Sequence, residues 1–414
     1  MADPRDPLVA GQYEAYPYPE RNPADEAKRL IEGSPSDLPE LAHYLFRGRA
    51  PNPFRALIAG GGTGDAAIML AQHCATAGLD AEIVYLDMSS AARSIVEARA
   101  AARGLTNLRF VTGSLLEVAA VAPGPYDYID CCGVLHHLES PEDGLQALAK
   151  QLKPNGGMGL MVYGEYGRRG VYETQALLRH LAPPNQPGKE RLAQTRRLLA
   201  ALPRTNGLTR NPFVQDHKAA GDAGLYDLLL HARDRAYTVP QLADLVASAG
   251  LAIVGFIEPA RYAPATYLRD PRLLAPLAAL PSVDQAAAAE ALVGNLRKHT
   301  VYVAPAAGAE TRTASPTDRA LVPVLRRHAP EAIAKALRAG SLSVDLEGFP
   351  AKFPAPPRAA AIAQRLDGQR SIAAILADLR AADPNLTEEK AAEAFDALYR
   401  LLNGLNLLFL TDRP

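Results

Sequence analysis

Short apolar runs alternate with longer alanine-rich stretches of helical character from Phe54 to Tyr163. This alternation is typical of βαβ units, in which parallel strands form an open sheet and the connecting helices cover its faces. The apolar runs predict strands at residues 55–60, 81–87, 107–113, 126–132 and 157–163. Helices are predicted near residues 65–77, 89–103 and 141–151, and a turn is predicted at Lys153-Pro154-Asn155-Gly156-Gly157. The chain is therefore expected to have an α/β fold with a doubly wound, mainly parallel sheet.

The strand pattern is interrupted over residues 164–237, which are rich in proline, arginine and polar turns and predict an insertion. From Thr238 a capped amphipathic helix leads into an apolar run at 251–257, and the run from His299 predicts a last strand. We expect a cap segment over 1–50, a catalytic domain over 51–305 with 164–237 as its cap insertion, a linker region over 306–356 and a small α-rich domain over 357–414.

Composition excludes several classes of protein. The chain has 414 residues, of which 48% are hydrophobic, and a formal net charge of -1, which gives no overall attraction to nucleic acid or to anionic membranes. Its three cysteines cannot form a disulfide framework and lack the spacing of metal ligands. The N-terminus lacks the apolar centre of a signal peptide, and no uncharged run of about 18 residues occurs. A cytoplasmic protein that does not cross a membrane is expected.

A glycine-rich turn follows the first predicted strand. Gly60, Gly62 and Gly64 are spaced GxGxG, and glycine lets the backbone approach a bound ligand closely. The fingerprint of dinucleotide-binding proteins requires a third glycine or an alanine where this chain has Asp65. A carboxylate there would face the pyrophosphate of NAD, whereas it suits S-adenosylmethionine, which has no phosphate and carries an amino group. The turn favours S-adenosylmethionine, although a plain strand-to-helix connection would have a similar sequence.

Polar side chains follow the next two predicted strands. Asp87 ends the second strand, about 20 residues after the turn, where a carboxylate can accept both ribose hydroxyls. Alternatively, Asp87 only caps the helix that begins at Ser89. Ser114 follows the third strand, at the edge where an adenine would lie, and it is equally suited to be a helix N-cap. Both interpretations remain open for each residue.

The fourth strand leads into Cys132-Gly133-Val134-Leu135-His136-His137-Leu138. With this run the chain resembles the class I S-adenosylmethionine-dependent methyltransferases, in particular their ubiquinone-biosynthesis-like and type 11/12 branches. The resemblance covers residues 54–163 well and most of 54–305. The resemblance implies a seven-stranded Rossmann-like sheet whose last strand is antiparallel. The sequence departs from the family pattern at Ser114, where an acidic residue is common. Cofactor-binding residues are then expected at Gly60, Gly62, Gly64, Asp65, Asp87, Met88, Ser114, Leu115, Gly133 and His137.

The histidine pair of this run lies at the carboxyl end of the predicted sheet, where ligands of parallel sheets bind. In the resembling family the pair is often structural, so catalysis by His136 or His137 is one of two interpretations. As metal ligands the two histidines lack a third partner at a usable spacing, and no metal site is expected.

Candidates for the acceptor side lie outside the central sheet. Methyl transfer from a sulfonium needs positioning and exclusion of water, and it needs a base only if the acceptor atom carries a proton. His217, His231 and Tyr237 in the insertion, and Tyr18 in an aromatic N-terminal segment, are the candidate catalytic residues. The insertion has twelve basic and seven acidic side chains, which suits an acidic acceptor or peptide, or else a solvated cover.

The last predicted domain, residues 357–414, has three helical patterns and an apolar end that are typical of a small winged-helix unit. Its seven basic side chains are offset by eight acidic ones, which disfavours nucleic acid as a partner. The domain loosely resembles winged-helix domains that present peptides to modifying enzymes. The acceptor is therefore predicted to be a small molecule or a peptide or protein, and the oligomeric state does not follow from the sequence. The alternative function is a non-catalytic protein that binds S-adenosylmethionine or a peptide.

Overall fold

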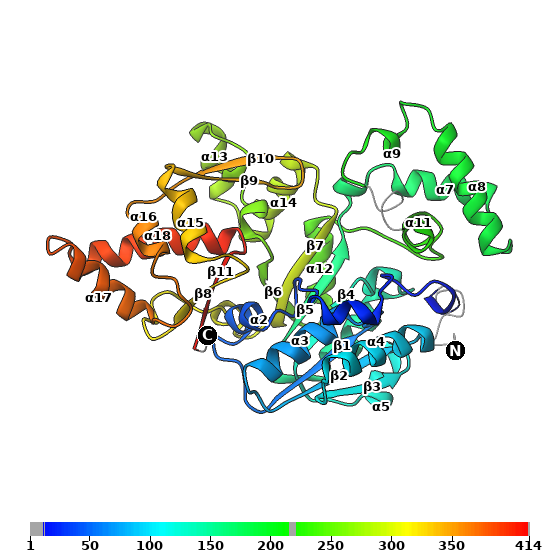
Figure 1. Ribbon diagram of the computed structural model, residues 1–414. Helices are drawn as coiled ribbons and strands as arrows, with labels where there is room; N and C mark the ends of the chain where they lie inside the picture. Colours follow the sequence, from blue (N-terminus) through cyan, green and yellow to red (C-terminus); the bar gives the residue numbers. More distant parts are fainter. Residues whose placement is uncertain (1–10, 12, 215–220, 413–414) are drawn as a thin grey trace.

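The computed structural model describes residues 11, 13–214 and 221–412. A seven-stranded sheet lies at the centre of the molecule, with the strand order β3-β2-β1-β4-β5-β7-β6 (Figure 1). The strands are β1 (Phe54–Ala59), β2 (Ala81–Asp87), β3 (Leu108–Thr112), β4 (Tyr126–Cys132), β5 (Leu152–Tyr163), β6 (Leu251–Phe256) and β7 (Lys298–Pro305). Strands β1 to β5 are parallel, and β7 runs antiparallel to both β5 and β6. The predicted seven-stranded Rossmann-like sheet with an antiparallel last strand is confirmed.

Helices cover both faces of the sheet because alternate side chains of each strand point to opposite faces. In β1, Ala56 and Ile58 pack with the helices α2, α3 and α4. Their neighbours Leu57 and Ala59 belong to the opposite core, which includes side chains of α5, α6 and α12. These helices are α2 (Leu38–Leu45), α3 (Asp65–Thr76), α4 (Ser90–Arg103), α5 (Val118–Val121), α6 (Pro141–Ala149) and α12 (Val239–Ser248).

Strand β5 begins earlier than its sequence predicts. Tyr126 of β4 pairs with Leu152, and Tyr128 pairs with Gly157, so that β4 advances by two residues while β5 advances by five. Residues 153–156 therefore bulge out of the pairing within β5, instead of forming a turn before it. The prolines and glycines of this stretch are explained by the bulge.

The insertion forms a helical lobe at one side of the sheet, drawn in green in Figure 1. Its helices are α7 (Val171–Leu181), α8 (Gly188–Ala201), α9 (Gly207–Arg210) and α11 (Gly221–Leu229). The lobe has its own apolar core, which includes Val171, Leu192 and Leu228. The chain leaves the sheet at Tyr163 and returns at Tyr237, and the amide of Tyr237 donates to the Tyr163 carbonyl at 2.8 Å. Both ends of the lobe are therefore fixed at the carboxyl end of β5.

A second insertion, between β6 and β7, carries α13 (Pro271–Ala278) and α14 (Ser282–Val293).

Residues after the sheet form a C-terminal unit, drawn in orange and red in Figure 1. The C-terminal unit consists of β8 (Val322–Leu325), α15 (Pro330–Arg338), β9 (Ser341–Asp345), β10 (Pro350–Pro354), α16 (Ala359–Ala363), α17 (Ile372–Ala382), α18 (Glu388–Gly404) and β11 (Leu408–Thr411). The 3₁₀ helices of the chain are η1 (Pro23–Ala27), η2 (Leu115–Glu117), η3 (Leu135–His137), η4 (Tyr166–Arg168), η5 (Pro259–Tyr262), η6 (Pro264–Thr266) and η7 (Ala309–Thr311).

The structure differs from the predicted linker over residues 306–356. This stretch contains β8, α15, β9 and β10, and its side chains Ile333 and Leu337 share one core with Ile375 and Phe395 of the following helices. Strand β8 also pairs antiparallel with β11 near the end of the chain. Within the stretch β9 and β10 pair with each other, whereas the partner of β8 is more than 80 residues away, which concealed β8 in the sequence. None of the helices that the structure describes is long and apolar enough to cross a membrane.

Candidate functional site

The glycine-rich turn after β1 is fastened to the end of β2. The amide of Gly60 donates to the Leu86 carbonyl at 2.8 Å, and the amide of Gly62 donates to the Asp87 carboxylate at 2.8 Å. The φ angle is +73° at Gly60 and +50° at Gly62, a region that residues with a Cβ rarely adopt. A Cβ on Gly60 would lie 2.4 Å from Cγ2 of Val134. The turn therefore leaves its backbone bare at the carboxyl end of the sheet.

Asp87 is a buried carboxylate at the end of β2. Burial raises its pKa, and bonds from backbone amides, including those of Ser89 and Gly62, oppose that rise. The helix α4 is capped by Ser89, whose hydroxyl accepts from the amide of Ala92 at 3.0 Å. Asp87 therefore does not cap α4, and its carboxylate lines a cavity.

The cavity has a volume of about 740 Å³ and extends from the glycine turn, past the exit of β4, to the insertion lobe. Ligand pockets of proteins typically measure about 300–1,000 Å³. Nine of the predicted cofactor-binding residues line it, namely Gly60, Gly62, Asp65, Asp87, Met88, Ser114, Leu115, Gly133 and His137. Gly64 does not line it, because a Cβ there would lie 2.1 Å from Cγ2 of Val96 in α4. Gly64 instead lets α3 pack closely against α4.

Ser114 forms the N-cap of η2, since its hydroxyl accepts from the amide of Leu116 at 3.2 Å. The helix-cap interpretation of Ser114 is therefore what the structure shows. The residue still lines the cavity together with Leu115. Its predicted contact with an adenine stays a prediction.

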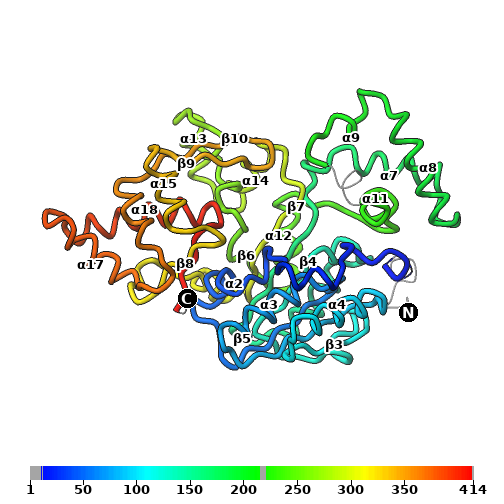
Figure 2. The backbone as a smooth tube through the Cα atoms, viewed as in Figure 1, coloured from blue at the N-terminus to red at the C-terminus, as the bar shows by residue number. Residues whose placement is uncertain are grey.

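Residues 13–27, here called the N-terminal strap, run across the carboxyl end of the sheet (dark blue in Figure 2). The hydroxyl of Thr63 donates to the Pro19 carbonyl at 2.7 Å, and the amide of Ser90 donates to the Glu14 carboxylate at 2.9 Å. The Tyr18 carbonyl would lie 2.9 Å from a Cβ on Gly62. The strap thus covers the glycine turn and the start of α4.

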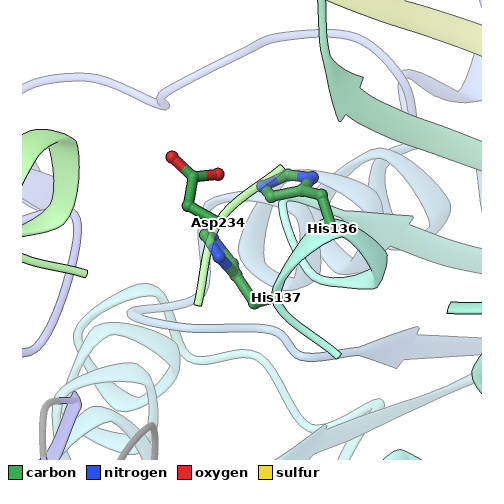
Figure 3. A group of neighbouring side chains, drawn as sticks. All are labelled: His136, His137 and Asp234. Carbon is green, nitrogen blue, oxygen red and sulfur yellow. The ribbon is translucent and has the colours of Figure 1, made fainter. Parts of the chain in front are cut away.

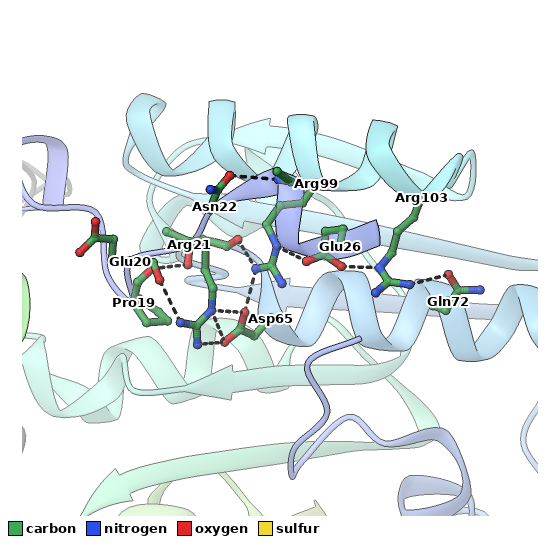
Figure 4. A network of polar contacts seen from close by, with 11 residues as sticks. Pro19, Glu20, Arg21, Asn22, Glu26, Asp65, Gln72, Arg99 and Arg103 are labelled. Carbon is green, nitrogen blue, oxygen red and sulfur yellow. Dashed lines mark hydrogen bonds and ion pairs between the residues drawn. The ribbon is translucent and has the colours of Figure 1, made fainter. Parts of the chain in front are cut away.

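An ion-pair network holds the strap to the sheet domain (Figure 4). Arg21 binds the Asp65 carboxylate at 2.6 Å, and Arg99 binds the same carboxylate at 2.7 Å. Arg99, whose side chain is 1% exposed, also binds Glu26 at 2.6 Å, and Arg103 pairs with Glu26 as well. Burial alone would raise the pKa of Asp65, but the bonds from the two guanidinium groups lower it below its usual value. Asp65 is therefore charged, and any cofactor amino group would share it with Arg21 and Arg99.

A second polar group lies at the other end of the cavity. The Asp227 carboxylate of α11 is approached by the hydroxyl of Tyr13 from the strap and by that of Tyr163 from β5, each at 3.3 Å. The Tyr13 hydroxyl is also 3.2 Å from Nε2 of His231. Burial raises the pKa of Asp227, and the charge of Arg168 and the hydrogen bond from Tyr13 oppose this rise. The strap and the sheet each contribute one side chain to this group, and the lobe contributes Asp227 and His231.

The histidine pair follows β4 on η3 and lies beneath the lobe. His137 stacks on His231 with ring centroids 3.7 Å apart, and its Nδ1 lies 2.8 Å from the Arg233 carbonyl. His136 is completely buried, and burial lowers its pKa well below the usual value. Its ring packs against that of Tyr163 at 4.1 Å. The two histidines thus join the sheet to the lobe.

The four predicted catalytic residues have different places in the structure. Tyr18 lines the cavity. His231 lies behind the cavity, in contact with Tyr13 and His137. The Tyr237 side chain packs into the apolar core beneath the sheet, away from the cavity, because its backbone continues the pairing of β5. His217 lies outside the described residues. The catalytic roles of all four stay predictions.

Sequence reasoning did not single out Tyr13, Tyr163 or Asp227. Asp227 and His231 are four residues apart, a spacing that places two side chains on one face of a helix, and this was the available signal. Tyr163 is the last residue of a predicted strand, where side chains reach the ligand edge of a parallel sheet.

Comparison with known proteins finds a match to part of the sheet domain. Residues 57–158 match the family described as a methyltransferase domain. Over 276 residues the chain is 31% identical to an uncharacterized protein of Synechococcus sp., a match that covers 64% of this chain and 63% of that protein. Over 118 residues it is 30% identical to the tRNA 5-carboxymethoxyuridine methyltransferase of Escherichia coli K12, covering 28% of this chain and 43% of that enzyme. The chain thus spans less than two thirds of the length of these relatives.

The fold as a whole is similar to that of PKMT2 from Rickettsia typhi, solved in complex with AdoHcy. The TM-score is 0.64 at 14% identity, and the match covers 92% of this chain and 76% of that chain. The similarity therefore includes parts of both the insertion lobe and the C-terminal unit in addition to the sheet.

Proposed function

We propose that this protein, whose central domain belongs to the class I S-adenosylmethionine-dependent methyltransferases, transfers a methyl group from that cofactor to an N, O or C atom of an acceptor. The observation that carries the proposal is the single cavity that runs from the glycine turn and Asp87 to Tyr13, Tyr163 and Asp227. Its volume of about 740 Å³ is at the upper part of the range for ligand pockets, which suits a cofactor and part of an acceptor together.

The residues at the glycine end fit S-adenosylmethionine. Gly60 and Gly62 adopt positive φ and line the cavity with backbone alone, and the buried Asp87 is an acceptor for ribose hydroxyls. Leu115 and Met88 provide apolar surface for the adenine, and the charged Asp65 suits the amino group of the methionine portion. When bound, the cofactor would supply an electrophilic methyl group on its sulfonium.

The residues at the lobe end fit the handling of an acceptor. Asp227 is a buried carboxylate with a raised pKa, so it can take up a proton from an acceptor atom that carries one. The hydroxyls of Tyr13 and Tyr163 hold that carboxylate in place. The strap and the lobe exclude water from this end, which strengthens the contacts that orient the acceptor. In this proposal positioning and desolvation contribute most of the rate enhancement.

The acceptor is proposed to be a small molecule or a peptide or protein. The relative that acts on tRNA matches only 28% of this chain, within the sheet domain, and so does not bear on the acceptor. The winged-helix likeness of residues 357–414 supports contact with a protein and stays a prediction. A cytoplasmic location is likewise proposed from the sequence alone. The alternative is a non-catalytic protein that binds S-adenosylmethionine or a peptide.

A labelled-methyl assay tests the proposal. The purified protein is incubated with S-adenosylmethionine labelled in its methyl group and with a bacterial cell extract separated into small-molecule and protein fractions. We expect label to appear in one fraction, and the fraction identifies the acceptor class. If the protein binds S-adenosylmethionine in calorimetry but labels neither fraction, the non-catalytic alternative is supported instead.

A further inference from the structure

We propose that His136, His137 and Asp234 form a binding site for a divalent transition-metal ion beside the acceptor end of the cavity. Each of the three residues offers one ligand atom, and these atoms lie within 4.8 Å of one another. Figure 3 shows the two imidazoles and the carboxylate gathered in one place, the histidines on η3 and Asp234 on the segment that returns from the lobe. The site goes beyond the proposed methyl transfer and does not depend on it.

His136 is the first observation that supports a ligand here. Its side chain is completely buried, and neither ring nitrogen has a hydrogen-bond partner among the described residues. A buried polar atom without a partner costs about 1–3 kcal/mol, and such atoms are rare in folded proteins. A metal ion bound to one nitrogen would remove the part of this cost that belongs to that nitrogen.

His137 is oriented as a metal-binding histidine is. Its Nδ1 lies 2.8 Å from the Arg233 carbonyl, which can only accept a hydrogen bond, so Nδ1 carries the proton of the neutral ring. Nε2 then carries the lone pair. Histidines that bind metals usually donate their other ring N–H to a carbonyl or carboxylate, because this contact fixes the tautomer and the ring orientation.

One carboxylate oxygen of Asp234 accepts hydrogen bonds, and the other has no hydrogen-bond partner among the described residues. Its side chain is completely buried, and Oδ2 accepts from Arg168 at 3.0 Å and from Gln175 at 3.1 Å. Oδ1 has no hydrogen-bond partner among the residues that the structure describes. The carboxylate is thus positioned by two side chains while one oxygen remains for a cation.

A second group, His137, Asp227 and His231, has the same spacing but is already satisfied. Both oxygens of Asp227 accept from tyrosine hydroxyls. Nδ1 of His231 accepts from the amide of Arg233 at 3.1 Å, so the proton of the neutral ring is on Nε2, next to Tyr13. His231 therefore offers no ring lone pair, and each oxygen of Asp227 already accepts a hydrogen bond, so the ion is assigned to the group with Asp234.

The ligand types indicate the class of ion. Two imidazole nitrogens and one carboxylate oxygen suit Zn²⁺ or Co²⁺, whereas Mg²⁺ and Ca²⁺ prefer oxygen ligands. Three protein ligands leave a coordination position open, as in catalytic zinc sites. His137 also lines the cavity, so the ion would lie next to the acceptor. The sequence spacing concealed this site, because Asp234 is 97 residues from His137.

Metal binding is measured on the untagged full-length protein after treatment with a chelator. Zn²⁺ alone is titrated by calorimetry, and Co²⁺ is titrated by its visible absorption, which reports the ligand geometry. We expect one ion per chain, and we expect Asp234→Asn and His136→Phe each to weaken binding at least about tenfold. His136→Phe removes two unpartnered nitrogens, so it should keep the melting temperature. His180→Asn, an exposed histidine on the lobe, is the control.

The proposal is overturned if the wild-type protein binds neither ion, or if both variants bind as the wild type does. It is also overturned if His231→Asn abolishes binding while Asp234→Asn retains it, because the ion would then lie in the second group. S-adenosylmethionine affinity, measured on the same samples, is expected to be independent of metal, which separates this result from any failure of the proposed methyl transfer.

Discussion

In the proposed function, cofactor binding depends most directly on Asp87, because this side chain is buried beside the bare glycine turn. Asp87→Ala removes the acceptor for two ribose hydroxyls and the bond from the Gly62 amide. Hydrogen bonds to charged groups contribute about 1.5–3 kcal/mol each, so the affinity for S-adenosylmethionine should fall by at least about a hundredfold. Isothermal calorimetry measures this change.

The matched control for this substitution is Asp80→Ala, at an exposed carboxylate before β2. It should bind the cofactor as the wild type does. An Asp87→Ala variant that melts like the wild type and retains full affinity would disprove the assignment of the cofactor end.

At the scale of single residues, the sequence singled out side chains that line the glycine end of the cavity and missed Tyr13, Tyr163 and Asp227 at its other end. Gly60, Gly62 and Asp87 lie within 30 residues of one another, and their spacing is set by one βαβ unit. Tyr13, Tyr163 and Asp227 come from the strap, the sheet and the lobe. Their meeting depends on how three separate segments pack, and spacing along the chain does not encode it.

At the scale of elements, two glycines of the same turn, Gly62 and Gly64, have different structural roles. A Cβ on Gly62 would lie 2.9 Å from the Tyr18 carbonyl of the strap, whereas a Cβ on Gly64 would lie 2.1 Å from Val96 in the core. A positive φ angle lowers the stability of Gly62→Ala and of Gly64→Ala by about 1–2 kcal/mol each. Overpacking in the core lowers the stability of Gly64→Ala by about 1–3 kcal/mol more. We therefore expect Gly64→Ala to lower the melting temperature by several degrees more than Gly62→Ala does.

Gly62→Ala should instead lower the affinity for S-adenosylmethionine, since its methyl group displaces the strap where it covers the cofactor end. Calorimetry and thermal unfolding on both variants give the comparison. Equal losses of stability, together with wild-type affinity in Gly62→Ala, would mean that the turn is only a connection.

The N-terminal strap is an element whose contribution to turnover should exceed its contribution to stability. Removal of residues 1–19 deletes Tyr13 and Glu14 but retains Arg21 and Glu26, which hold the remaining strap to the sheet domain. We expect the rate of methyl transfer to fall at least about tenfold, because the acceptor end is opened to water, while the melting temperature changes little.

Removal of residues 1–10 alone is the control for this truncation, because it retains Tyr13. If the longer truncation transfers methyl groups at the wild-type rate, the strap is not part of the catalytic machinery.

The elements predicted best from the sequence are those with a regular period. Strands β1 to β4 are short and mostly apolar, and each lies within one residue of its predicted bounds. The bulge at 153–156 was mistaken for a turn because proline and glycine occur in both. Strand β8 was mistaken for linker because it is short and pairs with β11 at the other end of the unit.

At the scale of the whole molecule, the C-terminal unit is fixed to the sheet domain through His43 of α2. Nδ1 of His43 accepts from the amide of Leu410 in β11 at 3.1 Å, and Nε2 lies 3.1 Å from the Tyr399 hydroxyl of α18. Burial lowers the pKa of His43 to about 3. The unfolded chain takes up a proton below pH of about 6.5, and the folded chain does not, so the free energy of unfolding falls as the pH falls.

This contribution of His43 amounts to about 2 kcal/mol between pH 6.5 and 5. Burial raises the pKa of Glu40 to about 7, which acts in the opposite direction, so the effect of His43 is the difference between wild type and His43→Asn. We expect a steeper loss of stability with acidification in the wild type, measured by urea unfolding. The exposed His180→Asn should follow the wild type; parallel curves for His43→Asn and wild type would refute the prediction.

The central claim is that one cavity binds the cofactor at Asp87 and handles the acceptor at Asp227. The most direct test is the rate at which Asp227→Asn transfers labelled methyl groups to the acceptor fraction, with S-adenosylmethionine affinity measured on the same sample. General acid–base groups contribute about 10²–10⁴-fold to rates, so we expect wild-type affinity and a transfer rate lower by about a hundredfold. Transfer at the wild-type rate by Asp227→Asn would contradict the claim.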